Sequence, residues 1–168
     1  MIHVCSLARL HGTVDETGAR HVVTLLRDTH LVQRPHLIAE GNHLILSMDD
    51  ITGPLDGFSH PLEEHVVRLI EFVQGWDRKT PMVMHCYAGI SRSTAGAFVA
   101  ACALNPRRNE FAIAQAIRDG SATATPNARI VTLADALLGR QGRMIGAISA
   151  IGVGRPAHEG DPLRLDLE

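Results

Sequence analysis

Residues 81–94 have the sequence PMVMHCYAGISRST, and this stretch decides the fold. Residues 82–84 are a short apolar run that predicts a buried strand, with Pro81 at its start. Residues 91–104 are apolar on nearly every side and predict a buried helix that ends before Pro106. The loop between strand and helix therefore gathers backbone N–H groups at a helix N-terminus, and that geometry binds anions.

The residue types in this loop predict nucleophilic chemistry on a phosphoryl group. A helix N-terminus and converging N–H groups favour a thiolate, so we expect Cys86 to be a nucleophile. Arg92 has a planar guanidinium that can hold two phosphoryl oxygens at once. Ser93 or Thr94 could donate a hydrogen bond to the thiolate when it becomes a leaving group. Gly89 permits the backbone conformation that a tight loop needs.

The order His85, Cys86, five residues, Arg92 and then Ser-Thr resembles the signature of the cysteine-dependent protein tyrosine phosphatases. The inner sequence AGISRS is most similar to their dual-specificity branch. A lone cysteine is usually a small buried hydrophobe, and a lone arginine usually lies on a solvated surface. Both residues at this spacing, between a strand and a helix, are hard to explain as packing.

The rest of the chain predicts an α/β fold with one sheet. Apolar runs predict further strands at residues 2–7, 21–26 and 43–48, and helices are expected from residue 61, from residue 109 to 120 and from residue 127 to 139. Residues 8–17 are expected to form a loop or a poor helix, and residues 27–42 a loop with a short helix. Strand–helix–strand crossovers imply parallel pairing. We therefore expect a central, mostly parallel sheet of about four to five strands flanked by helices, as in protein tyrosine phosphatases.

The resemblance covers about residues 2–139. We accordingly expect residues 1–142 to form a phosphatase-like catalytic domain. Residues 143–168 are expected to be a C-terminal tail, rich in glycine at first and then polar, which could pack or be disordered.

A pair of aspartates follows the predicted third strand. Ligand sites of α/β sheets lie at the carboxyl ends of strands, so Asp49 and Asp50 should converge with Cys86. Side chains alternate along an extended segment, so only one of the two can face the cleft. The sequence LSMDD is similar to the family's acid loop, which places Asp50 at the catalytic position and Asp49 at the supporting one. Asp56, on a turn next to Gly57, would need a mobile loop to reach in.

The resemblance implies a mechanism without cofactor or metal. Cys86 would attack phosphorus to form a phosphocysteine, an aspartic acid would protonate the leaving group, and the resulting carboxylate would then activate water. The residues expected to bind phosphate are Tyr87, Ala88, Gly89, Ile90, Ser91 and Arg92. His85 would position the loop and tune the thiolate. Asn127, in a Thr-Pro-Asn that resembles the family's Ser-Pro-Asn, would support the loop.

The composition of the chain argues against several classes of partner. The 168 residues carry a net charge of −2, which argues against nucleic acid or an anionic membrane as the main partner. No signal peptide is visible, and no apolar run reaches the ~20 residues that span a bilayer. Three cysteines suggest a reducing cytoplasm. The ten histidines show no metal-ligand spacing.

The substrate is expected to be a phosphorylated protein or a small phosphoester, with inorganic phosphate as product. In the classical tyrosine-specific branch of the family, an aromatic residue of a recognition loop deepens the pocket, whereas the only tyrosine here, Tyr87, lies in the catalytic loop. The resemblance therefore implies a shallow cleft that accepts phosphotyrosine, phosphoserine and phosphothreonine. The family's lipid phosphatases carry lysines within this loop, and residues 87–91 contain none, so the resemblance disfavours phosphoinositides. The alternatives are a phosphate-binding module of the pseudophosphatase kind, a phosphatase of a non-protein phosphoester, and, least favoured, a sulfur-transfer enzyme of rhodanese type.

The two remaining cysteines have a simple interpretation and a sharper one. Cys5 and Cys102 are most simply buried hydrophobic residues. The sharper hypothesis is that one of them forms a reversible disulfide with Cys86 that protects it from oxidation. Cys5, on a neighbouring predicted strand, is the better candidate.

Overall fold

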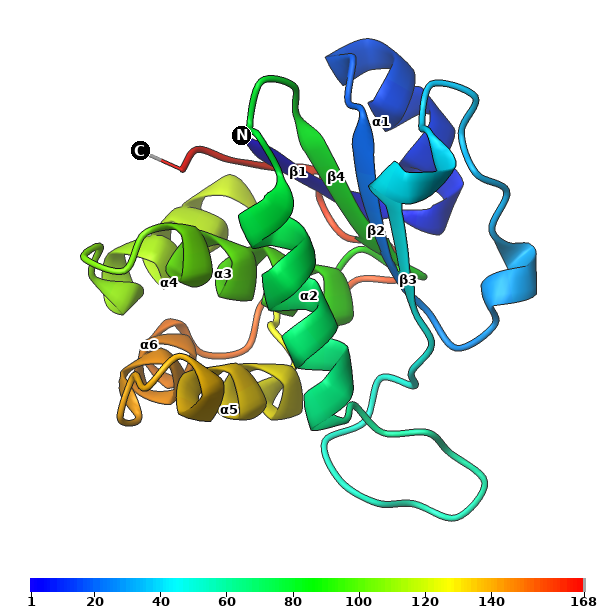
Figure 1. Cartoon of the computed structure of the whole chain (residues 1–168). Coiled ribbons are helices and arrows are strands. Elements are labelled where there is room, and N and C mark those ends of the chain that lie inside the picture. Colours follow the sequence, from blue (N-terminus) through cyan, green and yellow to red (C-terminus); the bar gives the residue numbers. More distant parts are fainter. Residues whose placement is uncertain (168) are drawn as a thin grey trace.

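A computed structural model describes residues 1–167 and shows one five-stranded sheet (Figure 1). Its strands are β1 (Ile2–Ser6), β2 (His21–Leu25), β3 (His43–Leu46), β4 (Met82–Cys86) and β5 (Leu163–Leu165). Their order is β3-β2-β4-β1-β5. The first four strands are parallel, while β5 pairs antiparallel with β1. The expected α/β fold with four to five strands is therefore confirmed.

Six α-helices cover the two faces of the sheet: α1 (Leu10–Thr17), α2 (Glu63–Gly75), α3 (Arg92–Leu104), α4 (Glu110–Gly120), α5 (Ala128–Leu137) and α6 (Arg143–Ile151). Helix α1 lies on one face, and α2 to α6 lie on the other (Figure 1). Short 3-10 turns occupy Leu7–Arg9, Thr29–Leu31 and Glu40–Asn42. Residues 1–167 contain no helix with the length and hydrophobicity that crossing a bilayer requires.

The strand residues divide between the two faces by alternation, as their burial shows. Val4, Met84 and their neighbours of the same parity join the large core under α2 to α6. Cys5 and Val83 join a smaller core with Leu10 of α1. Helix α3 is buried on all sides from Arg92 to Cys102, as its apolar sequence predicts.

The structure decides one local expectation, the loop or poor helix at residues 8–17, and corrects another, the end of the third strand. Residues 10–17 form a full helix, which Gly18 ends with a left-handed φ of 67°; its buried residues Leu10 and Val14, four apart, supply the apolar stripe. Strand β3 ends at Leu46 instead of residue 48, because the chain turns into a long exposed loop at residues 49–59.

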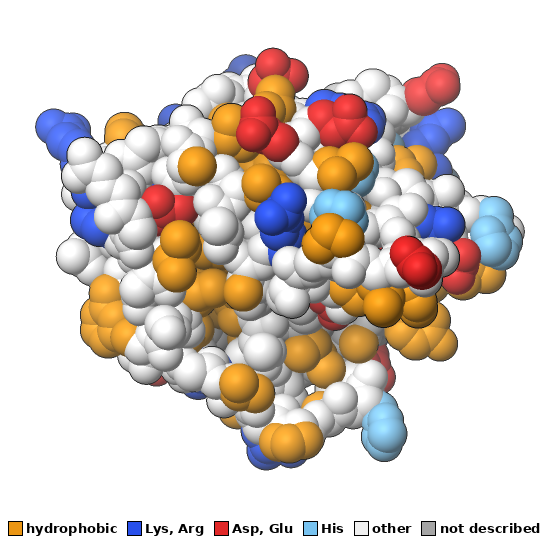
Figure 2. Space-filling model, turned by 90° about the horizontal axis from the view of Figure 1, so that it is seen from below, with side chains coloured by type: hydrophobic (Ala, Val, Ile, Leu, Met, Phe, Trp, Pro, Cys, Tyr) orange, Lys and Arg blue, Asp and Glu red, His pale blue; other side chains and the backbone are white. Residues whose placement is uncertain are grey.

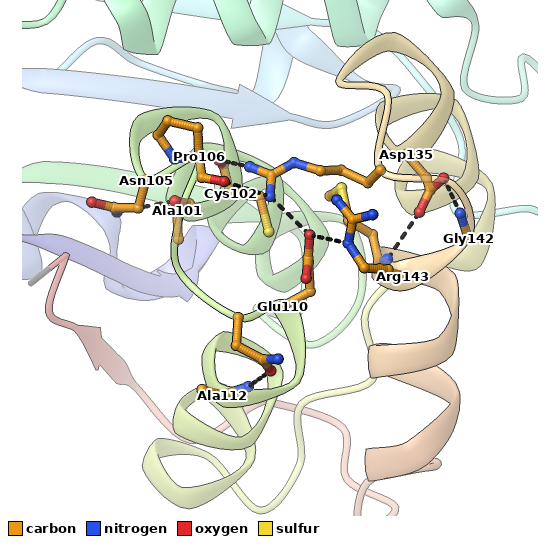
Figure 3. A network of polar contacts seen from close by, with 12 residues as sticks. Ala101, Cys102, Asn105, Pro106, Glu110, Ala112, Asp135, Gly142 and Arg143 are labelled. Carbon is orange, nitrogen blue, oxygen red and sulfur yellow. Dashed lines mark hydrogen bonds and ion pairs between the residues drawn. The ribbon is translucent and has the colours of Figure 1, made fainter.

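The segment after Gly142 packs against the domain. Helix α6 contacts α4 and α5, and β5 adds an edge strand beside β1. Glu110 on α4 accepts hydrogen bonds from Arg140 Nη1 (2.8 Å) and Arg143 Nε (3.1 Å). Figure 3 shows Glu110 beside Arg143. Asp135 on α5 accepts from the backbone N–H groups of Gly142 and Met144 and so holds the start of α6. Whether residue 142 also marks a functional boundary stays a prediction.

Candidate active site

The parallel strands β1 to β4 end at one edge of the sheet, where β4 leads into residues 86–92, called here the Cys–Arg loop. Cys86 is the last residue of β4 and is 1% exposed. Its Sγ lies 3.1 Å from Ser93 Oγ and accepts the Gly89 N–H at 3.3 Å. The loop enters α3 at Arg92, so the thiol lies beside a helix N-terminus, where a negative charge is stabilised.

Carbonyl groups of the Cys–Arg loop are anchored on its outer side. The carbonyls of Tyr87, Ala88, Ile90 and Ser91 accept from backbone N–H groups of Leu7, Gly160, Thr125 and Asn127, respectively, at 2.8–3.2 Å. In a trans peptide the next N–H points opposite to the carbonyl. The following N–H groups therefore face the inner side, as that of Gly89 does when it contacts the thiol. This concave row of donors is suited to an oxyanion.

Gly89 is required by both conformation and space. Its φ is +75°, and an added Cβ would lie 2.7 Å from the carbonyl carbon of Cys5. No larger residue fits without moving the end of β1. The tight loop predicted at this position is therefore built against β1.

The guanidinium of Arg92 contacts the chain just before Asp49. The side chain is 8% exposed, and Nη1 donates to the carbonyl of Met48 at 2.8 Å. Nε is buried and has no hydrogen-bond partner among residues 1–167. One donor of Arg92 thus fixes the side chain, and another is available to a bound oxyanion.

The two aspartates face different partners, as alternation predicts. Asp50 is exposed, and its Oδ1 accepts from Ser91 Oγ at 2.7 Å and from Asn127 Nδ2 at 2.8 Å. Asp49 Oδ2 instead accepts the Ser59 N–H at 2.7 Å and lies 3.6 Å from Arg27 Nη1. Asp50 therefore contacts the Cys–Arg loop, while Asp49 closes the 49–59 loop on itself.

Asn127 joins three parts of the site. Its Oδ1 accepts the N–H groups of Arg129 and Ile130 and so caps α5. Its Nδ2 donates to Asp50, and its backbone N–H donates to the carbonyl of Ser91.

Asp56 lies on the exposed 49–59 loop next to Gly57, which has a φ of +80°.

His85 is buried behind the thiol. Its Nε2 lies 2.6 Å from Thr24 Oγ1, and the same hydroxyl lies 2.8 Å from His43 Nε2. Burial lowers the pKa of His85 to about 4, so the ring is neutral at physiological pH. His85 on β4, Thr24 on β2 and His43 on β3 therefore form a hydrogen-bond chain across the three strands. The neutral His85 ring and the single proton of the hydroxyl fix the direction of its bonds.

Thr24 and Gly160 had no place in the sequence-based site. A threonine inside the run HVVTLL was a usable signal, because a buried hydroxyl needs a partner. Gly160 gave no signal, because its contact with the Cys–Arg loop depends on the path of the chain after α6. Residues 1–167 contain no group of three or more acidic, histidine or cysteine side chains arranged to hold a metal.

All three cysteines are free and buried, and the sheet register separates two of them. Ser6, not Cys5, is the partner of Cys86 across β1 and β4, so Cys5 faces the α1 side while Cys86 faces α3. Burial raises the pKa of Cys5 to about 11 and that of Cys102 to about 12. This arrangement argues against the hypothesis of a protective Cys5–Cys86 disulfide.

Comparison with known proteins gives one family match, over the middle of the chain. Residues 57–122, which include the whole Cys–Arg loop, match the family model described as protein-tyrosine phosphatase. No curated protein sequence matches the chain.

Solved structures share the fold. The PTP-2 phosphatase of Cydia pomonella is 18% identical with a TM-score of 0.63, over 80% of this chain and 84% of that one. A human tyrosine phosphatase-like serine/threonine/tyrosine-interacting protein is 17% identical with a TM-score of 0.62, over 83% of this chain and 92% of that one. PTPMT1, solved in complex with PI(5)P, is 16% identical with a TM-score of 0.58, over 89% of this chain and 93% of that one.

The family match falls on the segment that carries the cysteine, the anion-binding loop and the arginine, and it supports a phosphatase activity. The fold around that segment is the one these structures share. Residues 57–122 are therefore similar to the protein-tyrosine phosphatase family, and the whole chain shares the fold of the phosphatase structures.

Proposed function

We propose that the protein hydrolyses phosphomonoesters through a phosphocysteine intermediate. The observation that supports this most strongly is the thiol of Cys86 at the base of the Cys–Arg loop, within reach of Ser93 Oγ and the Gly89 N–H. In the first step Sγ attacks phosphorus, the S–P bond forms and the ester P–O bond breaks. Asp50 is the acid that gives the departing oxygen its proton.

The transition state spreads negative charge over three phosphoryl oxygens. The inward N–H groups of the loop and the guanidinium of Arg92 are the donors placed to stabilise that charge. They are fixed before substrate arrives, because the loop carbonyls and Arg92 Nη1 are already bonded to the surrounding structure.

In the second step water attacks the phosphocysteine. The Asp50 carboxylate takes a proton from the water, the S–P bond breaks, and inorganic phosphate leaves. Ser93 Oγ, 3.1 Å from the sulfur, donates to the thiolate as it departs. Asp50 is exposed at the mouth of the site, so water reaches it directly. No metal or cofactor takes part.

We further propose phosphotyrosine, phosphoserine and phosphothreonine in proteins as substrates. Residues 87–91 contain no lysine, so the loop itself offers no extra cation to a polyanionic headgroup. The face from which the 49–59 loop projects has hydrophobic, acidic and basic side chains interspersed (Figure 2). Such a mixed surface suits a polypeptide better than an anionic membrane. The free cysteines are consistent with a reducing, cytoplasmic location.

Cys86→Ser and Arg92→Ala test the mechanism with phenyl phosphate. Cys86→Ser should abolish turnover yet still bind tungstate, because the N–H row is intact. Arg92→Ala should lose both binding and turnover. Hydrolysis by Cys86→Ser at the wild-type rate would show that the proposed nucleophile is wrong, and tungstate binding without turnover by the wild type would favour a binding module.

A further inference from the structure

The chain after α6 contacts the Cys–Arg loop at Ala88 and Gly89, whereas Asp50 contacts it at Ser91. Residues 152–162, here called the C-terminal strap, run between α6 and β5. The Gly160 N–H donates to the carbonyl of Ala88 at 2.8 Å. A Cβ on Gly160 would lie 2.6 Å from the carbonyl oxygen of Gly89, so the strap touches the Cys–Arg loop backbone directly.

A pocket of about 300 Å³ opens between the strap, the start of the Cys–Arg loop and the chain after β1. It is lined by residues 6–8, 87–88 and 158–159. Ser6 is the register partner of Cys86 on adjacent parallel strands, and Tyr87 follows the nucleophile directly. The pocket is therefore lined by the residue that follows the nucleophile in the chain and by the residue that pairs with it in the sheet.

The Glu159 carboxylate connects the strap to residues 6–9 on one wall of this pocket. Glu159 Oε1 accepts from Ser6 Oγ at 2.6 Å and from Arg9 Nε at 2.9 Å. The hydrogen bonds from Ser6 and Arg9 hold the pKa of Glu159 below its usual value. Because Glu159 and Arg9 form an ion pair, the rim carries little net charge.

The lining itself is mostly apolar. Leu7, Ala8 and Ala88 form much of it, together with the ring of Tyr87, which is 64% exposed. An exposed aromatic ring beside small aliphatic residues favours an uncharged, apolar group. The strap supplies the polar edge through His158 and Glu159.

From this arrangement we infer that the pocket is a specificity subsite, which receives an apolar side chain next to the phosphorylated residue of a peptide substrate. The inference rests on the proposed phosphatase function. The occupant follows from continuity, because the pocket shares residues 87–88 with the loop that would hold the phosphoryl group. A substrate held there places its flanking residue over residues 6–8 and its leaving oxygen toward Asp50, which contacts the other end of the loop.

The test compares phosphotyrosine peptides that differ only in the flanking residue: leucine, alanine or aspartate. The wild type should show kcat/KM at least fivefold higher with leucine than with aspartate. Ala8→Leu should fill the pocket, and Ala8→Asp should charge it, so both should reduce the leucine-to-aspartate ratio toward one or below. Ala8 is exposed, so both variants should fold. Ala112→Leu, at an exposed position on α4, is the matched control and should keep the wild-type ratio.

The outcomes separate this inference from the proposed function. If the wild type hydrolyses phenyl phosphate but shows no flanking preference, or if both Ala8 variants keep the preference, the subsite is wrong and the phosphatase remains. If the wild type hydrolyses neither phenyl phosphate nor any peptide, both fail. Faster hydrolysis of phosphoinositide vesicles than of every peptide would also overturn the subsite.

Discussion

Thr24 Oγ1 lies 2.6 Å from His85 Nε2, so a hydroxyl on β2 holds the residue that precedes the nucleophile. Both groups are fully buried. The same hydroxyl also contacts His43 Nε2 at 2.8 Å. Because a hydroxyl has one proton, it donates to one ring and accepts from the other, which fixes the tautomers of the pair relative to each other.

Thr24→Val should therefore cost stability out of proportion to the atoms removed. The substitution keeps the shape but leaves a buried imidazole nitrogen without its partner, so the free energy of unfolding should fall by about 1–3 kcal/mol. Urea unfolding measures this. Thr132→Val is the matched control, because Thr132 is an exposed residue of α5 whose hydroxyl donates to the Ala128 carbonyl, and the change should cost much less. Equal losses in the two variants would contradict the role given to Thr24.

The buried ring of His85 also predicts how stability depends on pH. Its folded pKa of about 4 lies below the ordinary value of 6.5, because burial disfavours the charged form. Between these values the unfolded chain binds a proton that the folded chain does not. Stability should therefore fall as the pH drops from 6.5 to 4, by roughly 3 kcal/mol from this group. Urea unfolding of the wild type and of His85→Gln over this range isolates the contribution, and identical slopes would contradict it.

Much of the active site could be predicted from the sequence, because its central residues are neighbours in the chain. The strand, loop and helix around Cys86 follow from apolar runs, a glycine and a proline that are close in the sequence. The position of Asp50 beside the loop followed from the rule that parallel strands end at one edge. Its bonds to Ser91 and Asn127 could not be predicted, because they join residues 41 and 77 positions apart.

The C-terminal part of the chain could be predicted less well from the sequence. Helix α6 has nine residues and contains Gly146, and β5 has only three residues, so each gives only a short pattern in the sequence. Both elements depend on tertiary contacts: β5 on the free edge of β1, and α6 on the α4 and α5 surfaces. Propensity is a weak guide where such contacts decide.

One of those contacts predicts a large effect on stability. Arg140 is 6% exposed, donates to Glu110, and also reaches the carbonyls of Cys102 and Pro106. Arg140→Met should remove a donor from three acceptors, two of them in buried hydrogen bonds, and destabilise the protein by about 3–5 kcal/mol. Arg164→Met, which removes an exposed arginine paired with Asp166, should change stability by less than about 1 kcal/mol. Urea unfolding of both variants checks this, and similar values would contradict it.

Gly160→Ala should affect function more than stability. Its new Cβ would meet the Gly89 carbonyl at 2.6 Å, so the Cys–Arg loop or the strap must shift. A displacement near 1 Å in a catalytic loop can cost about 100-fold in rate, so kcat/KM for phenyl phosphate should fall at least tenfold and tungstate affinity should fall with it. Gly146→Ala, where an added Cβ meets nothing within 4 Å, is the control and should leave both unchanged. Wild-type kinetics in Gly160→Ala would show that the contact does not position the loop.

The last prediction separates the two aspartates. Asp50 contacts Ser91 on the Cys–Arg loop, whereas Asp49 accepts the Ser59 N–H and pairs with Arg27. Asp50→Asn keeps the size and hydrogen-bonding reach of the side chain but removes its acidic proton. Turnover of a phosphopeptide should therefore fall by roughly 10²–10⁴, and the loss should shrink for an aryl phosphate whose leaving group needs no proton.

Asp49→Asn is the matched variant, because it changes the neighbouring side chain in the same way. It weakens the closure of the 49–59 loop, so the expected loss of turnover is less than tenfold and similar for good and poor leaving groups. Proteolysis within the 49–59 loop should instead become faster, since the Arg27 pair and part of the Ser59 hydrogen bond are lost. Measuring kcat/KM against leaving-group pKa for both variants distinguishes the roles. A steep leaving-group dependence in Asp49→Asn, together with intact activity in Asp50→Asn, would reverse the assignment and make Asp49 the acid.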